Sequence, residues 1–265
     1  MSGIVIPNKV QTMYKKRLHT LLAATAIGVT TATMAATVYT ENFQIYEHRS
    51  SLNTAGWSYY LTNNTGVVDR SSIGNSDIGD IYNYTGNKYA YSQPKADGSY
   101  PDSGPGLMFT TDTVTGLDST DISDLSMMSV ALLADGTGGD PALGRLAIQI
   151  GSQWYASDET MTSTSNTGPT GSFANFQLSS TDFDNGNNWR LMTVTTGVAG
   201  EISVGSIAGG TLSGDVTAFG VYSENGNSGD HFRIDDFSIT VIPEPSTLIL
   251  GLLAGLGMMF RRRRN

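Results

Sequence analysis

Two adjacent carboxylates, Asp235 and Asp236, are a first candidate for chemistry in this chain. They lie in the alternating run 232–241, which predicts a β-strand, and neighbouring side chains of a strand point to opposite faces. One of the two therefore faces the interior, where a carboxylate needs a compensating partner. A hard cation such as Ca²⁺ prefers oxygen ligands and would serve, but Arg233 or a backbone amide could do the same.

A second oxygen-rich group is the segment 182–188, Asp-Phe-Asp-Asn-Gly-Asn-Asn. It has the glycine-turned composition of a calcium loop but lacks the closing bidentate Glu of the EF-hand pattern. Asn and Asp also dominate ordinary hairpin loops, because they tolerate turn conformations. The ordinary loop is the favoured interpretation.

Four aromatic residues of the body could stack on sugar rings: Trp57, Trp154, Tyr155 and Trp189. Trp154 and Tyr155 are neighbours in a predicted strand, so they point to opposite faces and at least one packs in the core. Aromatic residues on strands are usually packing residues. The sequence gives Trp154, Tyr155 and Trp189 as candidate ligand-binding residues, with core packing as the alternative.

No catalytic motif is present. The histidines of the body, His48 and His231, do not form H-E-x-x-H, and the chain contains no G-x-S-x-G, Walker A or G-x-G-x-x-G pattern. No cysteine is present, which excludes disulfides, thiolate nucleophiles and cysteine-ligated metals. We expect no catalytic residues, although a carboxylate pair assembled from distant strands would make a glycoside hydrolase possible.

The elements that must position these residues are short β-strands separated by turns. Spacing and alternation predict an all-β, antiparallel sandwich of ten to twelve strands in one domain, residues 37–241. The region 67–100 is expected to be loops with short strands, and 144–150 with 153–156 to form a hairpin. The other predicted strands are 38–46, 57–61, 106–114, 127–134, 173–178, 189–195, 201–204, 216–223 and 232–241.

The N-terminal residues 1–36 have the layout of a secretory signal peptide. A basic stretch, 15–17, precedes an apolar run, 18–29, and small residues follow up to Ala35 and Ala36, the two candidate cleavage positions. The true start is Met1 or Met13. This layout implies a signal helix and export through the Sec translocon.

The C-terminal residues 242–265 have three parts in order. Pro243, Glu244 and Pro245 form a stiff, non-helical tripeptide, because proline restricts itself and the residue before it. An uncharged apolar run, 247–260, would rise about 21 Å as a helix, short of a bilayer core of roughly 30 Å. Four basic residues end the segment, and they argue against burial of the run in a globular core; they are Arg261, Arg262, Arg263 and Arg264.

This C-terminal order resembles the PEP-CTERM sorting signal of Gram-negative bacteria. The resemblance implies recognition by the membrane protease-transpeptidase exosortase, with transient anchoring in the inner membrane by a hydrophobic helix. Cleavage near the Pro-Glu-Pro motif and delivery to the cell surface or the extracellular matrix would follow. A sorting signal of this kind says little about the body of the protein.

The first and last strands of the body resemble the paired terminal strands of jelly-roll domains, which include concanavalin-like lectin folds and carbohydrate-binding modules. In such modules a Glu near the first strand and an Asp in the last often bind Ca²⁺, which implies Glu41 and Asp235, with Asp236 as a fallback. The body has seven Lys or Arg and 23 Asp or Glu between residues 37 and 242, a net charge of about −16, which disfavours nucleic acid as a partner. We expect an exported, non-enzymatic protein that binds glycan or calcium; the alternative is a secreted polysaccharide-degrading enzyme.

Overall fold

The computed structural model describes residues 36–47, 50–63, 66–69, 71, 78–84, 87–92, 104–135, 143–162, 173–179, 183–224 and 231–241. All of them belong to one compact unit, Ala35–Ser246, close to the predicted domain 37–241. The predicted signal helix and C-terminal hydrophobic helix lie outside the described residues. Within the described part of the chain, no helix combines the length and apolar character needed to cross a membrane.

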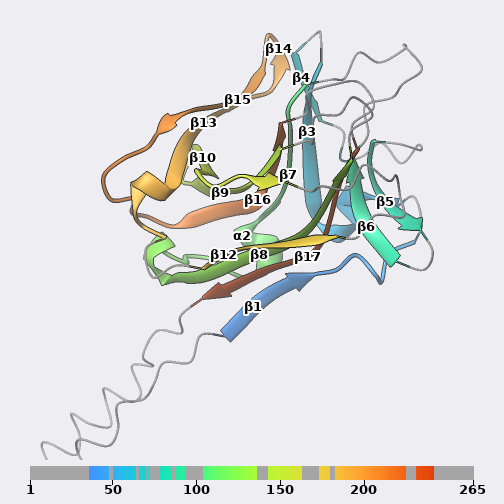
Figure 1. Cartoon of the computed structure of the whole chain (residues 1–265), viewed down its shortest axis with the longest axis horizontal. Helices are drawn as coiled ribbons and strands as arrows, with labels where there is room; N and C mark the ends of the chain where they lie inside the picture. The colour runs from blue at the N-terminus through green and yellow to red at the C-terminus, as the bar shows by residue number, and fades with distance from the viewer. Residues whose placement is uncertain are drawn as a thin grey trace, which may run out of the picture. The chain divides into compact units, whose positions relative to one another are not determined.

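Two antiparallel sheets form this unit (Figure 1). The seven-stranded sheet has the order β12 (Ala174–Ser179), β8 (Leu125–Asp135), β17 (His231–Val241), β6 (Asn87–Ser92), β5 (Ile78–Tyr84) and β2 (Ser50–Ser51), with β1 (Ala36–Glu41) also paired to β17. The ten-stranded sheet has the order β14 (Gly197–Val198), β4 (Gly66–Asp69), β3 (Trp57–Asn63), β7 (Gly106–Thr111), β16 (Val216–Glu224), β9 (Leu143–Ile150), β10 (Gln153–Ser157), β13 (Trp189–Thr195) and β15 (Glu201–Ile207), with β11 (Met161–Thr162) on β9. The described connections between them contain four single-turn helices: η1 (Leu52–Ala55), α2 (Asp112–Thr115), η2 (Ile122–Asp124) and η4 (Gly186–Asn188).

The main core lies between the two sheets. Alternate residues of β8 and β17, such as Val130 and Ile239, pack against residues of the facing sheet, such as Ile148 and Phe219. Trp57 is fully buried there and makes edge contacts with Phe43 and Phe237, at ring-centroid distances of 5.6 and 5.0 Å. The predicted all-β, antiparallel two-sheet class is therefore confirmed.

The ten-stranded sheet also has a core of its own on its other face. β14 follows β13 in the chain but pairs with β4 at the far end of the strand order, and β15 lies against β3 and β4. The sheet thus curls round on itself, as the upper part of Figure 1 shows. A second buried cluster, which includes Phe109, Trp154 and Met192, fills its inside.

The first and last strands pair as predicted, from Ala36 opposite Val241 to Glu41 opposite Phe237. The predicted hairpin is confirmed by the pairing of β9 with β10, joined through Gly151 at φ 59°, a left-handed conformation that glycine adopts without steric cost. Strand β1 is shorter than the predicted 38–46. Phe43 has φ 55° and its N–H donates to Glu41 Oε1 at 2.7 Å, which turns the chain out of the sheet.

Two other strand predictions needed correction. The described residues contain seventeen strands, more than the predicted ten to twelve. The polar region 67–100 holds β5 and β6, and the two-residue strands β2 and β14 are too short to show alternation in the sequence. The strand predicted at 106–114 ends at Thr111. There Asp112 begins a helical turn, and its Oδ1 accepts the Thr113 N–H at 2.7 Å.

Candidate functional site

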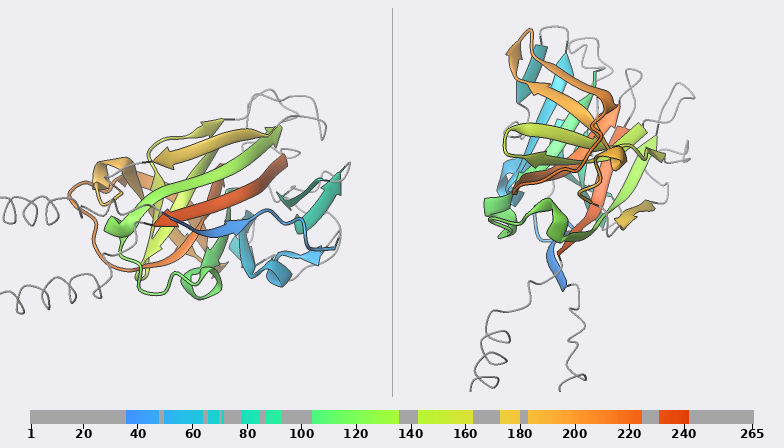
Figure 2. Two further views of the ribbon diagram at one scale, coloured as in Figure 1. Left: turned by 90° about the horizontal axis from the view of Figure 1, so that it is seen from below. Right: turned by 90° about the vertical axis from the view of Figure 1, so that its left-hand side faces the viewer.

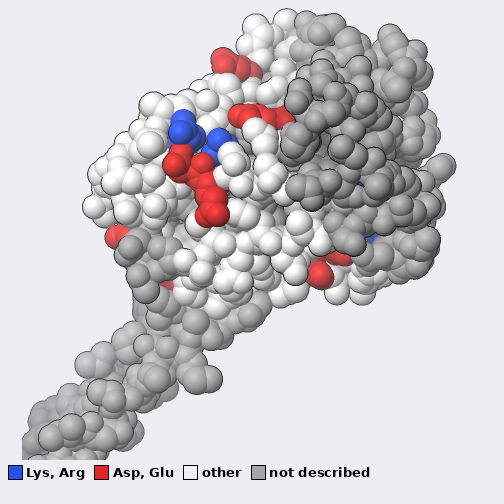
Figure 3. All heavy atoms as spheres, viewed as in Figure 1, with Lys and Arg blue, Asp and Glu red and all other residues white. Residues whose placement is uncertain are grey.

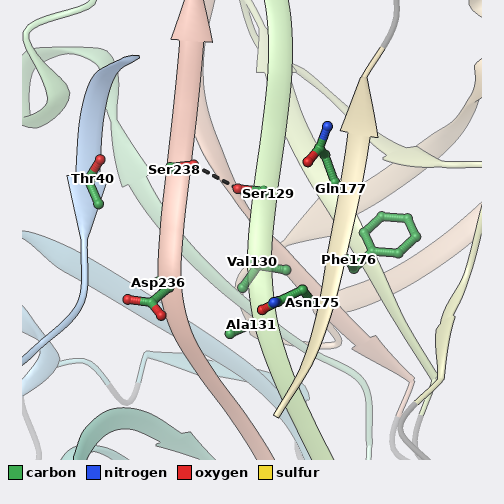
Figure 4. Close-up of a pocket in the computed structure, with 9 residues that line it drawn as sticks. All are labelled: Thr40, Ser129, Val130, Ala131, Asn175, Phe176, Gln177, Asp236 and Ser238. Carbon is green, nitrogen blue, oxygen red and sulfur yellow. Dashed lines mark hydrogen bonds between the residues drawn. The ribbon is translucent and has the colours of Figure 1, made fainter.

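A groove of about 430 Å³ crosses the outer face of the seven-stranded sheet. Four neighbouring strands form its floor: β1, β17, β8 and β12 (Figure 2, left view, and Figure 4). Its volume falls in the range of roughly 300–1,000 Å³ that small-molecule sites occupy. The lining residues are Thr40, Ser129, Val130, Ala131, Asn175, Phe176, Gln177, Asp236 and Ser238.

Strand register places four polar residues in one line across the groove. Thr40 is opposite Ser238, Ser238 is opposite Ser129, and Ser129 is opposite Gln177. Their side chains share the outer face, because the alternate residues Val130 and Ile239 face the core. Ser129 Oγ and Ser238 Oγ lie 2.7 Å apart in a hydrogen bond (Figure 4). The result is a row of hydroxyl and amide groups perpendicular to the strands.

A β-bulge brings a carboxylate to this row. Asp235 pairs with Ala131 and Ser238 with Ser129, so β17 has one extra residue in this stretch. Asp236 has φ 47° and is exposed, whereas Asp235 is buried and its Oδ1 accepts the Asp236 N–H at 2.9 Å. Bulges of this kind redirect a side chain, and here the redirected side chain lines the groove (Figure 4).

The lining is polar with little charge. Asp236 is its single ionisable side chain, and none of the nine residues is basic. On the face drawn in Figure 3, charged side chains are sparse among the described residues, and basic and acidic atoms meet in one patch. One ion pair of the described residues joins Arg190 Nε and Asp158 Oδ1 at 2.6 Å.

The candidate calcium ligands lie in the same part of the sheet. Glu41 is opposite Phe237, two positions from Asp235. It is nearly buried; its Oε1 accepts the Phe43 N–H and its Oε2 accepts the Tyr46 hydroxyl at 3.3 Å. Among the described residues no group of three or more His, Cys, Asp or Glu could hold a metal ion. Calcium binding at Glu41, Asp235 and Asp236 stays a prediction.

The environment of Glu41 gives an expected pH dependence. Burial raises the pKa of its carboxyl, and the Phe43 N–H and the Tyr46 hydroxyl lower it in part. The native state therefore binds this proton more tightly than the unfolded state, so stability should fall as pH rises from the ordinary Glu pKa through the raised native pKa. Glu41→Gln, which keeps the acceptor for Phe43, should remove this component in melting temperatures measured at pH 3.5–7.

The same variant tests the calcium prediction. If Glu41 is a ligand, chelation should lower the melting temperature of the parent protein and leave Glu41→Gln unchanged. Equal responses of both proteins to chelator would remove Glu41 from the ligand set.

The candidate aromatic ligand-binding residues are not brought together. Trp189 is fully buried, and its Nε1 donates to the Phe183 carbonyl at 2.8 Å. Trp154 is 6% exposed and packs edge-on against Phe109 inside the curled sheet. Tyr155, on the opposite face as alternation predicted, is half-buried against the main core. The burial of both tryptophans leaves them without a ring face for a sugar, so Trp154 and Trp189 are core-packing residues. Ligand binding at Tyr155 stays a prediction.

The described part of the oxygen-rich segment, 183–188, makes local contacts typical of a loop. The Asn185 side chain accepts the Asn187 N–H at 3.1 Å, and the Gly186 N–H donates to the Gly210 carbonyl at 2.8 Å. These contacts agree with the favoured interpretation of an ordinary loop. The sorting motif, Pro243, Glu244 and Pro245, and the basic cluster, 261–264, lie outside the described residues.

Sequence reasoning missed most of the groove. Thr40, Ser129, Asn175, Gln177 and Ser238 come from four strands that are distant in sequence, and each looks like an ordinary outward-facing polar residue. Only Asp236 had been singled out. The available signal was the alternation itself, which puts these residues on the outer face of their strands.

Comparisons with known proteins identify no family. No family model matches the sequence, and no curated protein matches it. Among solved structures, the CBM22-1 xylan-binding domain from Paenibacillus barcinonensis has 9% identity and a TM-score of 0.41, over 80% of this chain and 99% of that chain. A CBM2 module of a Lactobacillus casei phage protein has 11% identity and a TM-score of 0.36, over 79% and 98%. The K3 adhesin domain of Lys-gingipain from Porphyromonas gingivalis has 13% identity and a TM-score of 0.34, over 78% and 99%. These likenesses are too distant to bear on the activity of this chain.

Proposed function

We propose that this chain is an exported, non-enzymatic protein whose body, a variant of the jelly roll, binds a neutral polysaccharide in the groove over β1, β17, β8 and β12. The observation that carries the proposal is the row of Thr40, Ser238, Ser129 and Gln177 across four strands. Hydroxyl and amide groups both donate and accept hydrogen bonds. A ligand with many hydroxyl groups can satisfy such a row, whereas an apolar ligand would leave it unpaired.

The charge of the groove supports a neutral ligand. Asp236 is its one carboxylate, and the body around it has a net charge of about −16. An acidic polymer would be repelled by this field. A carboxylate acceptor also favours a ligand that offers hydroxyl donors in pairs, as sugars do.

The presence of one carboxylate among the described groove-lining residues favours binding over hydrolysis. Glycoside hydrolases use two carboxyl groups about 5–9 Å apart, one on each side of the scissile bond. Asp236 has no second carboxylate beside it among the groove-lining residues. A polysaccharide would therefore be held by this groove without being cut.

Binding can be measured directly on residues 37–242, because the compact unit contains both sheets and the whole described core and should fold alone. We expect neutral glycans on an array, or neutral polysaccharides in affinity electrophoresis, to retain this fragment. Retention should change little between low salt and about 0.5 M salt, since salt screens charge and not neutral hydrogen bonds. Retention by acidic glycans alone would contradict the proposal.

We also propose that export uses the Sec translocon and that exosortase processes the C-terminal segment. The supporting observation is the order of the Pro-Glu-Pro motif, the apolar run and the arginines at 242–265. Proline disfavours a helical backbone at its own position and at the residue before it, and extended segments fit clefts that pair with a substrate backbone. Calcium bound by Glu41 and Asp235 would have a structural role in the body of the protein.

Sorting gives a sharp prediction. Replacement of Pro243, Glu244 and Pro245 by alanine should yield an uncleaved, membrane-retained protein, because the run 247–260 then continues as a helix through the cleavage region. Immunoblots of membrane and extracellular fractions would measure this. Alanine at Pro94 and Pro105 is the matched control and should be processed normally. Normal processing of the motif variant would refute the sorting assignment.

A further inference from the structure

We propose that β12 is a self-pairing edge through which two copies of this chain form one continuous sheet, with their grooves side by side. β12 ends the strand order of the seven-stranded sheet, and in the described part of the chain it pairs only with β8. The pairing does not depend on what the groove binds.

The edge lacks the usual protection against such pairing. Natural edge strands carry charged residues or proline, or are very short. Two other edge strands carry a charged residue: β1 includes Glu41 and β15 includes Glu201. β12 reads Ala-Asn-Phe-Gln-Leu-Ser over six residues, with neither charge nor proline. In a body of net charge about −16, a neutral strand is where a second acidic copy can approach with least repulsion.

The sequence of β12 is complementary to itself in antiparallel register. Phe176 and Leu178 are partly buried and pack on the main core, whereas Asn175, Gln177 and Ser179 are exposed on the outer face. A two-fold axis at Gln177 places Phe176 opposite Leu178 of a second copy and Asn175 opposite its Ser179. Each pair then shares one face, as an antiparallel ladder requires. Such an interface, with the same patch on both copies, is the commonest form of dimer.

A slot beside the edge offers space for one side chain of the added strand. This slot, of about 190 Å³, lies where β12 and β8 meet the segment around β11, and it is lined in part by Leu132, Met161, Ala174 and Phe176. In the proposed register, Leu178 of the second copy lies next to Phe176 on this inner side. Strand addition typically combines backbone pairing with pockets that accept alternate side chains.

The dimer would join the two grooves. Asn175 and Gln177 line the groove and belong to the pairing strand. A two-fold axis perpendicular to the sheet leaves both grooves on the same face, on either side of the joined β12 strands. One polymer chain could then contact both, which raises avidity without a new contact.

The test uses the absence of cysteine in this chain. Directly opposite Cα atoms in an antiparallel pair are about 4.5–5.5 Å apart, within disulfide range. Under mild oxidation, residues 37–242 with Gln177→Cys should form a covalent dimer at least tenfold faster than the control Thr193→Cys, an exposed position on β13. Equal rates for the two variants would overturn the proposal.

A charge exchange checks the register. Gln177→Lys and Gln177→Glu, each alone, should weaken self-association at least tenfold in sedimentation, because like charges meet at the two-fold axis. An equimolar mixture should associate again. A parent fragment that sediments as a monomer at all concentrations up to about 1 mM, or variants that associate as the parent does, would overturn the proposal even if glycan binding is found.

Discussion

Trp57→Ala is expected to lower the free energy of unfolding by about 3–5 kcal/mol, the range for loss of a large aromatic side chain from a core. Trp57 is fully buried between the two sheets and contacts Phe43 after β1 and Phe237 in β17. Its Nε1 donates to the Tyr39 hydroxyl at 3.0 Å. Burial raises the pKa of Tyr39 to about 12, so this hydroxyl stays protonated at ordinary pH. The substitution would therefore remove packing and a hydrogen bond together.

Denaturant unfolding of residues 37–242 measures this effect. Trp57→Phe should cost less, since it keeps most of the ring contacts and loses the hydrogen bond. Val198→Ala is the surface control: Val198 is 92% exposed, and its replacement should change stability by less than about 0.5 kcal/mol. A loss of less than about 1 kcal/mol for Trp57→Ala would contradict the placement of Trp57 at the centre of the core.

Asp236→Asn is expected to weaken glycan binding about tenfold. A hydrogen bond to a charged acceptor contributes about 1.5–3 kcal/mol, and a hydrogen bond between neutral groups contributes about 0.5–1.5 kcal/mol. A difference near 1.4 kcal/mol corresponds to about a tenfold change in the dissociation constant. Asn tolerates the left-handed φ of 47° found at this position, so the bulge and the stability should be kept. The reduced affinity would then report on the carboxylate and not on folding.

Titration calorimetry with a neutral oligosaccharide gives the affinities. Asp118→Asn, at an exposed site outside the groove lining, has the same charge change and should bind as the parent does. Equal loss in both variants would mean that net charge matters and not the groove. Unchanged binding by Asp236→Asn would remove the carboxylate from the site.

Alternation and turn residues were enough to predict much of the fold. The β9–β10 hairpin followed from strict alternation around a glycine, and β13 was predicted with its observed bounds. The opposite faces of Trp154 and Tyr155 also followed from alternation. What alternation could not provide was the environment on each side. The curled sheet has a second core on its other face, so both faces of β10 are covered. Trp154 is therefore buried, although a strand of a simple sandwich would leave one of its faces exposed.

The site was less predictable for a related reason. Its polar residues come together through cross-strand register, which links Thr40 to Ser238 across almost the whole body. Register depends on pairing partners and bulges, and the bulge at Asp235–Asp236 has no sequence signal beyond the Asp pair itself. The pair was recognised as needing one buried and one exposed side chain. Only the folded structure shows that the bulge directs the Asp236 side chain into the groove.

The proposed binding site for a neutral glycan lies on the outer face of the seven-stranded sheet. Titration of isotope-labelled residues 37–242 with neutral oligosaccharides, followed by amide chemical shifts, tests it most directly. The largest shifts should fall on Thr40, Ser129, Asn175, Gln177 and Ser238. Shifts centred on the ten-stranded sheet, or none with any neutral glycan tested, would contradict the account.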